Sequence, residues 1–484
     1  MINTTFLTRL FVSLILTSLM ATSFSNAQSY KSQISLNDLS AFKSSAKSWS
    51  IAGDAQAGLS QDNELMITKG DGILVNYLGK GKPGSNLVTI MEHGDIELEM
   101  DFLLSKATNS GVFLQGRYEV QLFDSWGNLN PNASDNGGIY ERWNDTKPEG
   151  EKGYDGHAPR QNVSRAPGLW QHLKVSFQAP GFDAQGKKTS DAKILRLWLN
   201  DVLVQENIVL SGPTRYAIDQ KESVKGPLIF QGDYGSAAFK NIRYTSIDSK
   251  NRDGVSNTGN LNSNDAVSPI FIGATDNKIL RSFTDLPGNL RVNHAVGVGS
   301  REQLHYTYDL DNGMIVQIWR GNFLDATPMW HERGDGSSKP AGSVQYLGKP
   351  APGISRLISD NDSLKRDTLG TGYKPKGYTL DKEGRPTFKY LIYGTAVSDA
   401  SKVLPEGKGL RREISLSAPI SNAVICIAKG RNIILMKSGM YIIDGSYYIN
   451  LEEAGGTKPR IRTSGSIQEL IIPVKQKLIY SIIL

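Results

Sequence analysis

Short runs that alternate apolar and polar residues, or are rich in β-branched residues, extend along nearly the whole chain. Gly and other turn-forming residues interrupt them every eight to twelve positions, as around residues 195–204 and 315–319. The pair Asn200-Asp201 separates LRLWL from VLVQE, which is a two-residue hairpin signal. No amphipathic helical stretch of convincing length competes with the strands. The pattern predicts an all-β protein built as a sandwich or jelly roll.

One segment, residues 249–268, breaks this pattern because it is almost purely polar and rich in Asn, Asp, Ser and Gly. That composition is typical of a linker. A chain of 484 residues is also long enough for two domains. We therefore predict a first β-domain over residues 30–247, a linker over 248–268 and a second β-rich domain over 269–484.

The amino-terminal residues 1–27 read as a signal peptide. Arg9 precedes an apolar run over residues 10–20, and Ser25-Asn26-Ala27 offers a small-residue cleavage site. The run is too short to span a bilayer, and no later stretch approaches the required length. We expect an exported protein, periplasmic or secreted, without a membrane span. The alternative reading of the segment is an uncleaved anchor.

Charge and cysteine content exclude several functions. Lys and Arg number 54 against 48 Asp and Glu, but the basic residues are scattered and form no run with interleaved aromatics, so nucleic acid is not expected as a partner. The single cysteine, Cys426, excludes an intrachain disulfide, a Cys-rich zinc site and a c-type haem motif. No metal site is predicted, because His331-Glu332 has no third ligand in register.

The segment from Gly94 to Trp170 carries the candidate chemistry. Residues 118–123 alternate as a strand, so if Tyr118, Val120 and Leu122 face the core, Glu119 and Gln121 share the opposite face. Asp124 follows at the strand's end. Such a face is either a polar floor for sugar hydroxyls or an ordinary solvated surface, and the pattern alone leaves both open.

Ordered motifs in this region resemble a known family. They are NSGVFLQGRYEVQLFD at residues 109–124, GGIY at 137–140, Ala158-Pro159 with Asn162, and Gly168 with Trp170, followed by GPLIFQ at 226–231 and FKNI at 239–242. Together they resemble the bacterial 3-keto-disaccharide hydrolase family, also described as 3-keto-glucoside 1,2-lyase/3-keto-2-hydroxy-glucal hydratase domains, over roughly residues 36–247. The family often has Arg where Gln115 stands here, and Arg117 is offset by two positions.

The resemblance implies that the first domain is a concanavalin/laminin-G-like jelly roll that cleaves 3-keto-glycosides. A second β-sandwich domain follows it. A ketone at C3 acidifies the C2 proton, so a base can remove it, the enolate can expel the C1 aglycone, and water addition completes net hydrolysis. No cofactor is needed, because a separate sugar 3-dehydrogenase would make the ketone. The resemblance indicates Glu119 and Asp124 as the catalytic carboxylates, and His157, which lies in a Gly-rich loop just before Ala158-Pro159, is the third catalytic candidate. We also predict eight substrate-binding residues: Asn109, Gln115, Arg117, Gln121, Tyr140, Arg160, Gln231 and Lys240.

Other interpretations remain open at this stage. His157 can shuttle a proton near neutral pH, or it can be a loop histidine bonded to backbone. Glu119 and Asp124 can instead be the two carboxylates of a conventional glycoside hydrolase. A jelly roll also suits a non-catalytic, lectin-like carbohydrate-binding protein. The second half resembles a bacterial β-sandwich module of no assigned chemistry, in which Trp319 and Trp330 are predicted core residues.

Overall fold

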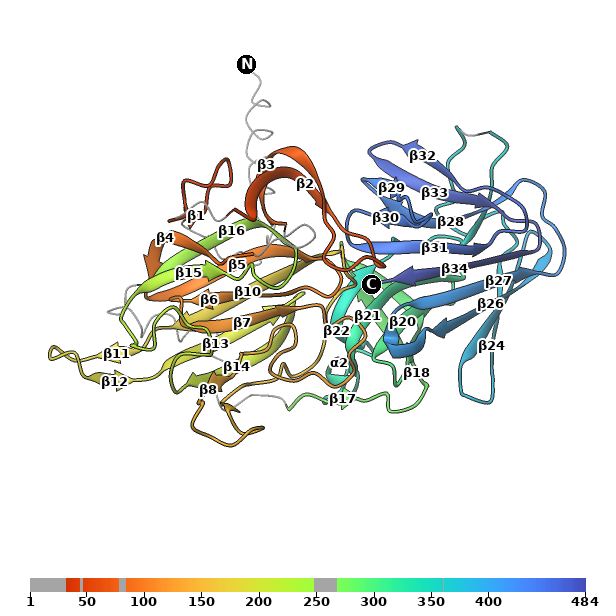
Figure 1. Cartoon of the computed structure of the whole chain (residues 1–484). Coiled ribbons are helices and arrows are strands. Elements are labelled where there is room, and N and C mark those ends of the chain that lie inside the picture. Colours follow the sequence, from red (N-terminus) through yellow and green to blue (C-terminus); the bar gives the residue numbers. More distant parts are fainter. Residues whose placement is uncertain (1–31, 44–46, 78–83, 248–267, 360) are drawn as a thin grey trace, which may run out of the picture.

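The computed structural model describes residues 32–43, 47–77, 84–247, 268–359 and 361–484. The signal peptide predicted at 1–27 and all of the predicted linker except Ser268 lie outside these residues. Two bodies stand side by side in Figure 1, one formed by the chain before the linker and the other by the chain after it. The prediction of an all-β fold is confirmed, since strands dominate both bodies, with only one short helix α2 (Thr327–Trp330) and one 3-10 turn η2 (Pro405–Gly407) in the described part.

The first domain is a two-layer jelly-roll sandwich. Its larger sheet, with β1 (Ser32–Gln33) beside β16, has the order β14 (Val202–Leu210), β13 (Ala192–Leu199), β10 (Trp170–Gln178), β5 (Asp95–Leu104), β16 (Ala237–Ile247), β3 (Met66–Asn76), β2 (Trp49–Gln56). Its smaller sheet has the order β4 (Leu87–His93), β15 (Gly226–Phe230), β6 (Asn109–Leu114), β7 (Tyr118–Phe123). Two short hairpins accompany them: β8 (Arg142–Trp143) with β9 (Gly153–Tyr154), and β11 (Gly181–Phe182) with β12 (Lys188–Ser190).

The core of this domain fills the space between the two sheets. Tyr118, Val120 and Leu122 of β7 all belong to it, together with Phe102 of β5 and Phe239 of β16. The alternation along residues 118–123 therefore predicts the buried face of β7. The predicted hairpin is also present, since Asn200 and Asp201 connect β13 to β14 with φ angles of 49° and 67°. Positive φ at both positions is what a tight two-residue hairpin turn requires.

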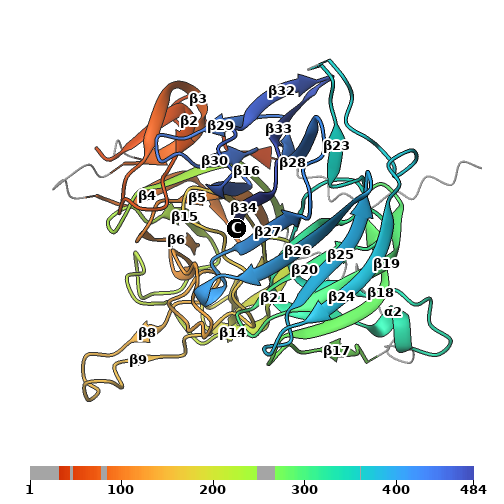
Figure 2. The same cartoon turned by 90° about the vertical axis from the view of Figure 1, so that its right-hand side faces the viewer.

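The second domain contains a second β-sandwich, seen from its outer side in Figure 2. One sheet, with β22 (Lys339–Tyr346) beside β21, has the order β17 (Phe271–Ile272), β21 (Met314–Asp325), β20 (Leu304–Asp309), β19 (Leu290–Gly299), β18 (Lys278–Leu286). The opposing sheet has the order β24 (Lys374–Leu380), β25 (Pro386–Ile392), β26 (Thr395–Val403), β27 (Leu410–Leu416), β34 (Lys477–Ile483), β31 (Tyr447–Glu453), β30 (Tyr441–Ile443), β29 (Ile433–Leu435). A third sheet has the order β23 (Ile354–Arg356), β28 (Ala423–Gly430), β33 (Ile467–Pro473), β32 (Arg460–Ser464).

Aromatic packing holds the second sandwich together. Tyr308 of β20 stacks on Phe388 of β25 with ring centroids 3.7 Å apart, which joins the two large sheets. Trp319 is fully buried, as predicted. The same prediction is wrong for Trp330, which is 51% exposed because it ends the surface helix α2. No helix in the described part of the chain is long and apolar enough to cross a membrane.

The two domains share an interface that is partly apolar and partly hydrogen-bonded. Leu169 of the first domain packs in one cluster with Ile442 and Tyr448 of the second. The buried Tyr448 hydroxyl donates to Pro167 O at 2.8 Å, and Trp170 N donates to Gly445 O at 3.0 Å. Hydrogen-bonding groups of each domain therefore find their partners in the other domain, and these bonds hold the two domains in contact.

Candidate functional site

Polar side chains gather on the face of the smaller sheet that points away from the core of the first domain. Glu119 and Gln121 of β7 lie there, and both are only 2% exposed. In the register of β6 and β7, Gly111 stands opposite Gln121 and Phe113 opposite Glu119. A Cβ at Gly111 would collide with Glu119 Oε1, so the absent side chain makes room for the carboxyl group. The pattern of β7 predicts this pair, but not its burial.

The Glu119 carboxyl group sits in surroundings that favour its protonated form. Burial raises its pKa well above the usual value, and the nearby Asp233 charge raises it further. The Gln121 amide, oriented to satisfy its own hydrogen bonds, donates to Glu119 Oε1 at 3.2 Å and to Ser110 O at 3.1 Å. The Asn109 side chain contacts the same amide at 3.2 Å. A protonated carboxylic acid held by one amide can donate a proton to a bound ligand.

Asp233 is the second carboxyl group of the site, and sequence reasoning missed it. Its side chain is exposed, and partial desolvation raises its pKa above the usual value, while its own amide and the Gln231 side chain oppose that shift by hydrogen bonding. Gln231 N donates to Gly111 O at 2.9 Å, which fixes this segment beside β6. Gln231 Oε1 is buried without a hydrogen-bond partner among the described residues. The only signal in the sequence was the place of Asp233 two residues after Gln231.

Tyr140 belongs to the site through the backbone. Its amide donates to Glu119 O at 3.1 Å, and Ile139 forms a bridge with Val120, so residues 137–140 continue the smaller sheet beyond β7. Burial raises the Tyr140 pKa, and the charges of Glu141 and Glu119 add to this shift. The hydroxyl therefore stays protonated near neutral pH and can donate a hydrogen bond.

A polar hollow of about 360 Å³ lies next to the edge of β7, where the backbone of Glu119 contacts Thr214. Its lining residues are Trp143, Asp145, Thr214, Arg215, Tyr216 and Gln220. Thr214 links the hollow to the backbone of β7, because its Oγ1 accepts a hydrogen bond from Glu119 N at 3.1 Å. The Arg215 guanidinium carbon lies 3.5 Å from the centre of the Trp143 ring. Sequence reasoning missed this hollow, since its walls come from two separate loops.

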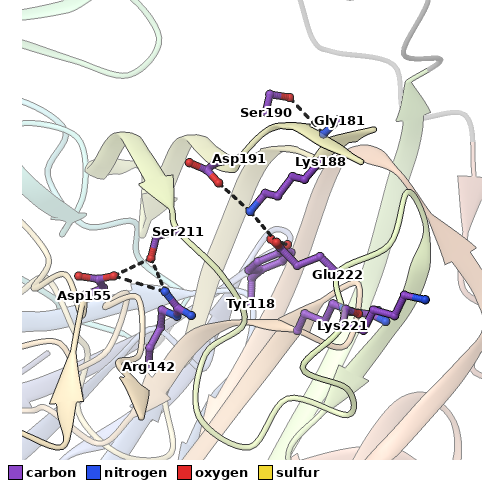
Figure 3. A network of polar contacts seen from close by, with 11 residues as sticks. Tyr118, Arg142, Asp155, Gly181, Lys188, Ser190, Asp191, Ser211, Lys221 and Glu222 are labelled. Atoms are coloured by element: carbon purple, nitrogen blue, oxygen red, sulfur yellow. Dashed lines mark hydrogen bonds and ion pairs between the residues drawn. The ribbon is translucent and has the colours of Figure 1, made fainter. Parts of the chain in front are cut away.

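Two polar networks, drawn in Figure 3, anchor the loop over residues 211–225, which supplies four of the six lining residues of the hollow. In the first, the Tyr118 hydroxyl donates to Glu222 Oε1 at 2.6 Å, and Lys188 pairs with Glu222 at 2.5 Å. In the second, Arg142 Nη1 donates to Ser211 Oγ at 2.7 Å, and Ser211 Oγ donates to Asp155 at 2.5 Å. The first network ties the loop over residues 211–225 to β7 and to the β11–β12 hairpin. The second ties the same loop to the β8–β9 hairpin.

Gln115 and Arg117, two predicted substrate-binding residues, hold this loop. Gln115 Nε2 donates to Val224 O at 3.1 Å, and Gln115 N donates to His93 Nε2 at 2.9 Å. Arg117 Nε donates to Lys221 O at 2.8 Å, and its Nη2 lies 3.7 Å from Asp219 Oδ2. Both side chains have their hydrogen-bonding groups directed at the protein itself.

The structure does not bring the other two predicted catalytic residues together with Glu119. Asp124 Oδ2 accepts a hydrogen bond from Ala107 N at 2.9 Å, so the carboxylate caps a turn beyond the end of β7. His157 pairs with Ile139, which in turn pairs with Val120. Directly opposed residues of antiparallel strands point to one face, so His157 shares the face of Val120 and not that of Glu119.

Arg160 and Lys240 also lie away from this site. Arg160 Nη2 pairs with Glu206 of β14 at 3.1 Å on an exposed edge of the larger sheet. Lys240 Nζ lies 3.7 Å from the centre of the Trp170 ring, on the face of β16 opposite to the core residue Phe239. Of the predicted residues, the face therefore gathers Glu119, Gln121, Asn109, Tyr140 and Gln231. No group of three or more His, Cys, Asp or Glu side chains suited to a metal ion occurs among the described residues.

A jelly-roll sandwich with carboxyl, amide and aromatic side chains on one sheet face has the composition expected of a carbohydrate-active domain. Residues 35–245 match the model of the 3-keto-alpha-glucoside-1,2-lyase-like domain, which confirms the resemblance predicted for this part of the chain. A comparison with curated proteins finds no match.

Several solved structures are similar to part of the chain. A presumed glycosyl hydrolase from Parabacteroides distasonis is 23% identical and covers 45% of this chain and 84% of its own, with a TM-score of 0.32. A second one from the same organism is 20% identical and covers 45% and 100%, with a TM-score of 0.29. The carbohydrate-binding module CBM66 from Bacillus subtilis is 13% identical and covers 42% and 99%, with a TM-score of 0.19.

Proposed function

We propose that the first domain cleaves 3-keto-glycosides by elimination followed by hydration. The observation that carries this proposal is the pair of carboxyl groups formed by the buried Glu119 of β7 and the exposed Asp233 of the loop after β15, whose charges interact and whose pKa values are both raised. Carboxyl groups with displaced pKa values are suited to acid and base roles near neutral pH. The family model that residues 35–245 match supports the substrate class.

In the proposed route, Asp233 acts as the base. It accepts the C2 proton, and the electrons of the broken C–H bond form an enolate with the C3 carbonyl. Glu119, kept protonated by burial, then donates its proton to the C1 oxygen as the C1–O bond breaks and the aglycone leaves. Tyr140 can donate a hydrogen bond to the enolate oxygen. Water adds across the C1–C2 double bond, which returns a proton to C2 and gives the free 3-keto sugar.

The remaining side chains of the face suit a sugar with many hydroxyl groups. The Gln121 and Asn109 amides and the unpartnered Gln231 Oε1 provide both donors and acceptors. Because the reaction begins with a ketone at C3, we propose that a separate sugar 3-dehydrogenase supplies the substrate. We also propose that the protein acts outside the cytoplasm, on the evidence of the signal-peptide pattern of residues 1–27.

Incubation of the full chain with a 3-keto-glucoside and, separately, with its unoxidised parent tests the proposal. We expect aglycone release from the keto sugar only. Equal release from both sugars would contradict the elimination route and favour direct hydrolysis by two carboxylates. Binding of both without release from either would favour a lectin-like protein.

A further inference from the structure

The hollow next to β7 contains a cation, Arg215, to which the described residues offer no side-chain acceptor. The Arg215 guanidinium makes no side-chain hydrogen bond or ion pair with any of the described residues, although the side chain is only partly exposed. Its contacts are with two aromatic rings, Trp143 at 3.5 Å and Tyr216 at 4.7 Å from the guanidinium carbon. Stacking covers the faces of the guanidinium plane and leaves its N–H edge for hydrogen bonding.

The acidic residue of the hollow is engaged elsewhere. Asp145 Oδ1 accepts a hydrogen bond from Trp143 Nε1 at 2.8 Å and makes no ion pair with Arg215. This bond instead fixes the indole on which the guanidinium stacks. Asp145 therefore orients the platform and leaves the Arg215 N–H edge available.

The loop that carries Arg215 is anchored on both sides. Arg215 N donates to Glu141 O at 2.8 Å, and Thr214 N donates to Arg117 O at 2.9 Å. Tyr140 contacts Glu119 through the backbone, and the positive charge of Arg215 opposes the rise that burial causes in the pKa of the Tyr140 hydroxyl. A ligand group bound in the hollow would therefore lie beside a sugar that is bound at Glu119, on the side where Tyr140 stands.

We propose that the Arg215 hollow is a subsite for a carboxylate on the leaving part of the substrate, so that the preferred substrates are 3-keto-glycosides of an acidic sugar. This inference rests on the proposed function and specifies its substrate class. A guanidinium presents a planar fork of donors that matches a carboxylate with two parallel hydrogen bonds. Neutral sugar hydroxyl groups offer no such match, so the charge of the aglycone becomes the selective feature.

Binding of two unoxidised disaccharides, glucosyl-glucuronate and glucosyl-glucose, tests the inference without any turnover. We expect the full chain to bind the acidic disaccharide on the order of 10- to 100-fold more tightly in calorimetry at low salt, the range for a charge-assisted pair of hydrogen bonds. The preference should shrink in 0.5 M NaCl because salt screens the charge. Arg215→Gln should abolish the preference, and Arg215→Lys should retain only part of it.

Arg196→Gln is the matched control, because Arg196 is an arginine paired with Glu206 on the larger sheet. It should leave the preference intact. Equal binding of the two disaccharides, or a preference that survives in Arg215→Gln, would overturn the inference. So would an equal loss of turnover on acidic and neutral 3-keto disaccharides in Arg215→Gln, since Arg215 would then serve the reaction itself. If neither keto disaccharide is cleaved while the binding preference stands, the proposed function fails and the subsite does not.

Discussion

At the scale of single residues, the surroundings of Glu119 decide what its carboxyl group can do. The missing side chain of Gly111 gives it room, and the surrounding protein leaves it almost fully buried. Asp233 is less buried than Glu119 and is bonded by the Gln231 amide, which lowers its pKa relative to burial alone. The two groups therefore differ in acidity, as an acid and a base in one mechanism must.

We predict that Glu119→Gln and Asp233→Asn each lower turnover of a 3-keto-glucoside by a factor on the order of 10² or more, the usual worth of a general acid or base. Asp124→Asn is the matched control, since Asp124 caps a turn outside the carboxyl pair and should affect thermal stability more than turnover. Steady-state aglycone release and the melting temperature of each variant check this. If Asp124→Asn loses turnover while Asp233→Asn keeps it, the pair is Glu119 and Asp124, as the sequence resemblance indicates.

Sequence reasoning could find only the part of the site that lies on one strand. Alternation along residues 118–123 placed Glu119 and Gln121 on a common face because side chains alternate strictly in a strand. Asp233 and Arg215 come from segments about a hundred residues further along the chain. Their place depends on which strands pair and on how the loop over residues 211–225 folds back, and neither is encoded in a local pattern. His157 is predicted from its place in a Gly-rich loop, but strand pairing turns it to the other face.

At the scale of elements, the loop over residues 211–225 is the part that closes the site, and side chains from the smaller sheet hold it. Arg117 bonds to Lys221 O and approaches Asp219, while Tyr118 bonds to Glu222 on the same loop (Figure 3). Every one of these anchors comes from the β6–β7 hairpin or its flanks. Movement of the loop would displace Thr214 and Arg215 relative to Glu119.

We predict that Arg117→Met raises KM for a keto disaccharide about tenfold or more, with a smaller change in kcat. The loss of its hydrogen bonds frees the loop but leaves the carboxyl pair in place. Limited proteolysis should then cut within residues 219–225, which the wild type protects. A pure loss of kcat with unchanged KM and unchanged protection would show that Arg117 acts on the reaction and not through the loop.

The whole molecule is stabilised by two sandwich cores and by the interface between them. The two-domain division follows from the polar composition of residues 249–268, and it stays a prediction because almost all of those residues lie outside the described ones. The interface could not be predicted, because its apolar residues, such as Leu169 and Tyr448, occur in strands and loops that look like any other part of a β-sandwich sequence.

We predict that cleavage in the linker leaves the two halves bound to each other. If the halves separated, the apolar cluster around Tyr448 would be exposed to water. The Tyr448 hydroxyl and the Trp170 N–H would also lose their hydrogen-bond partners in the other half. Limited proteolysis followed by size-exclusion chromatography checks this. Elution of two independent fragments would show that the interface is too weak to hold the domains together.

Two buried histidines make stability depend on pH. Burial lowers the pKa of His93 and of His305 to about 4, below the usual 6.5. The unfolded chain then binds protons more tightly than the folded one, so this contribution is complete above about pH 6.5 and is lost as the pH falls toward 4. Each histidine accounts for roughly 3 kcal/mol over that range.

Urea unfolding between pH 7 and 4.5 measures this loss, and a variant with His93→Gln and His305→Gln is the comparison. We expect a flatter pH dependence in the double variant, because glutamine does not titrate. An unchanged slope would assign the acid sensitivity to other groups.

The fate of the C2 hydrogen shows whether the reaction is an elimination with Asp233 as base and Glu119 as acid. A 3-keto-glucoside labelled with deuterium at C2 is incubated with the full chain in ordinary water, and the released sugar is analysed by NMR and mass spectrometry. We expect loss of the C2 deuterium to solvent, a transient 2-hydroxy-3-keto-glucal, and suppression of both in Asp233→Asn. Aglycone release at the normal rate with the C2 deuterium retained would contradict the elimination.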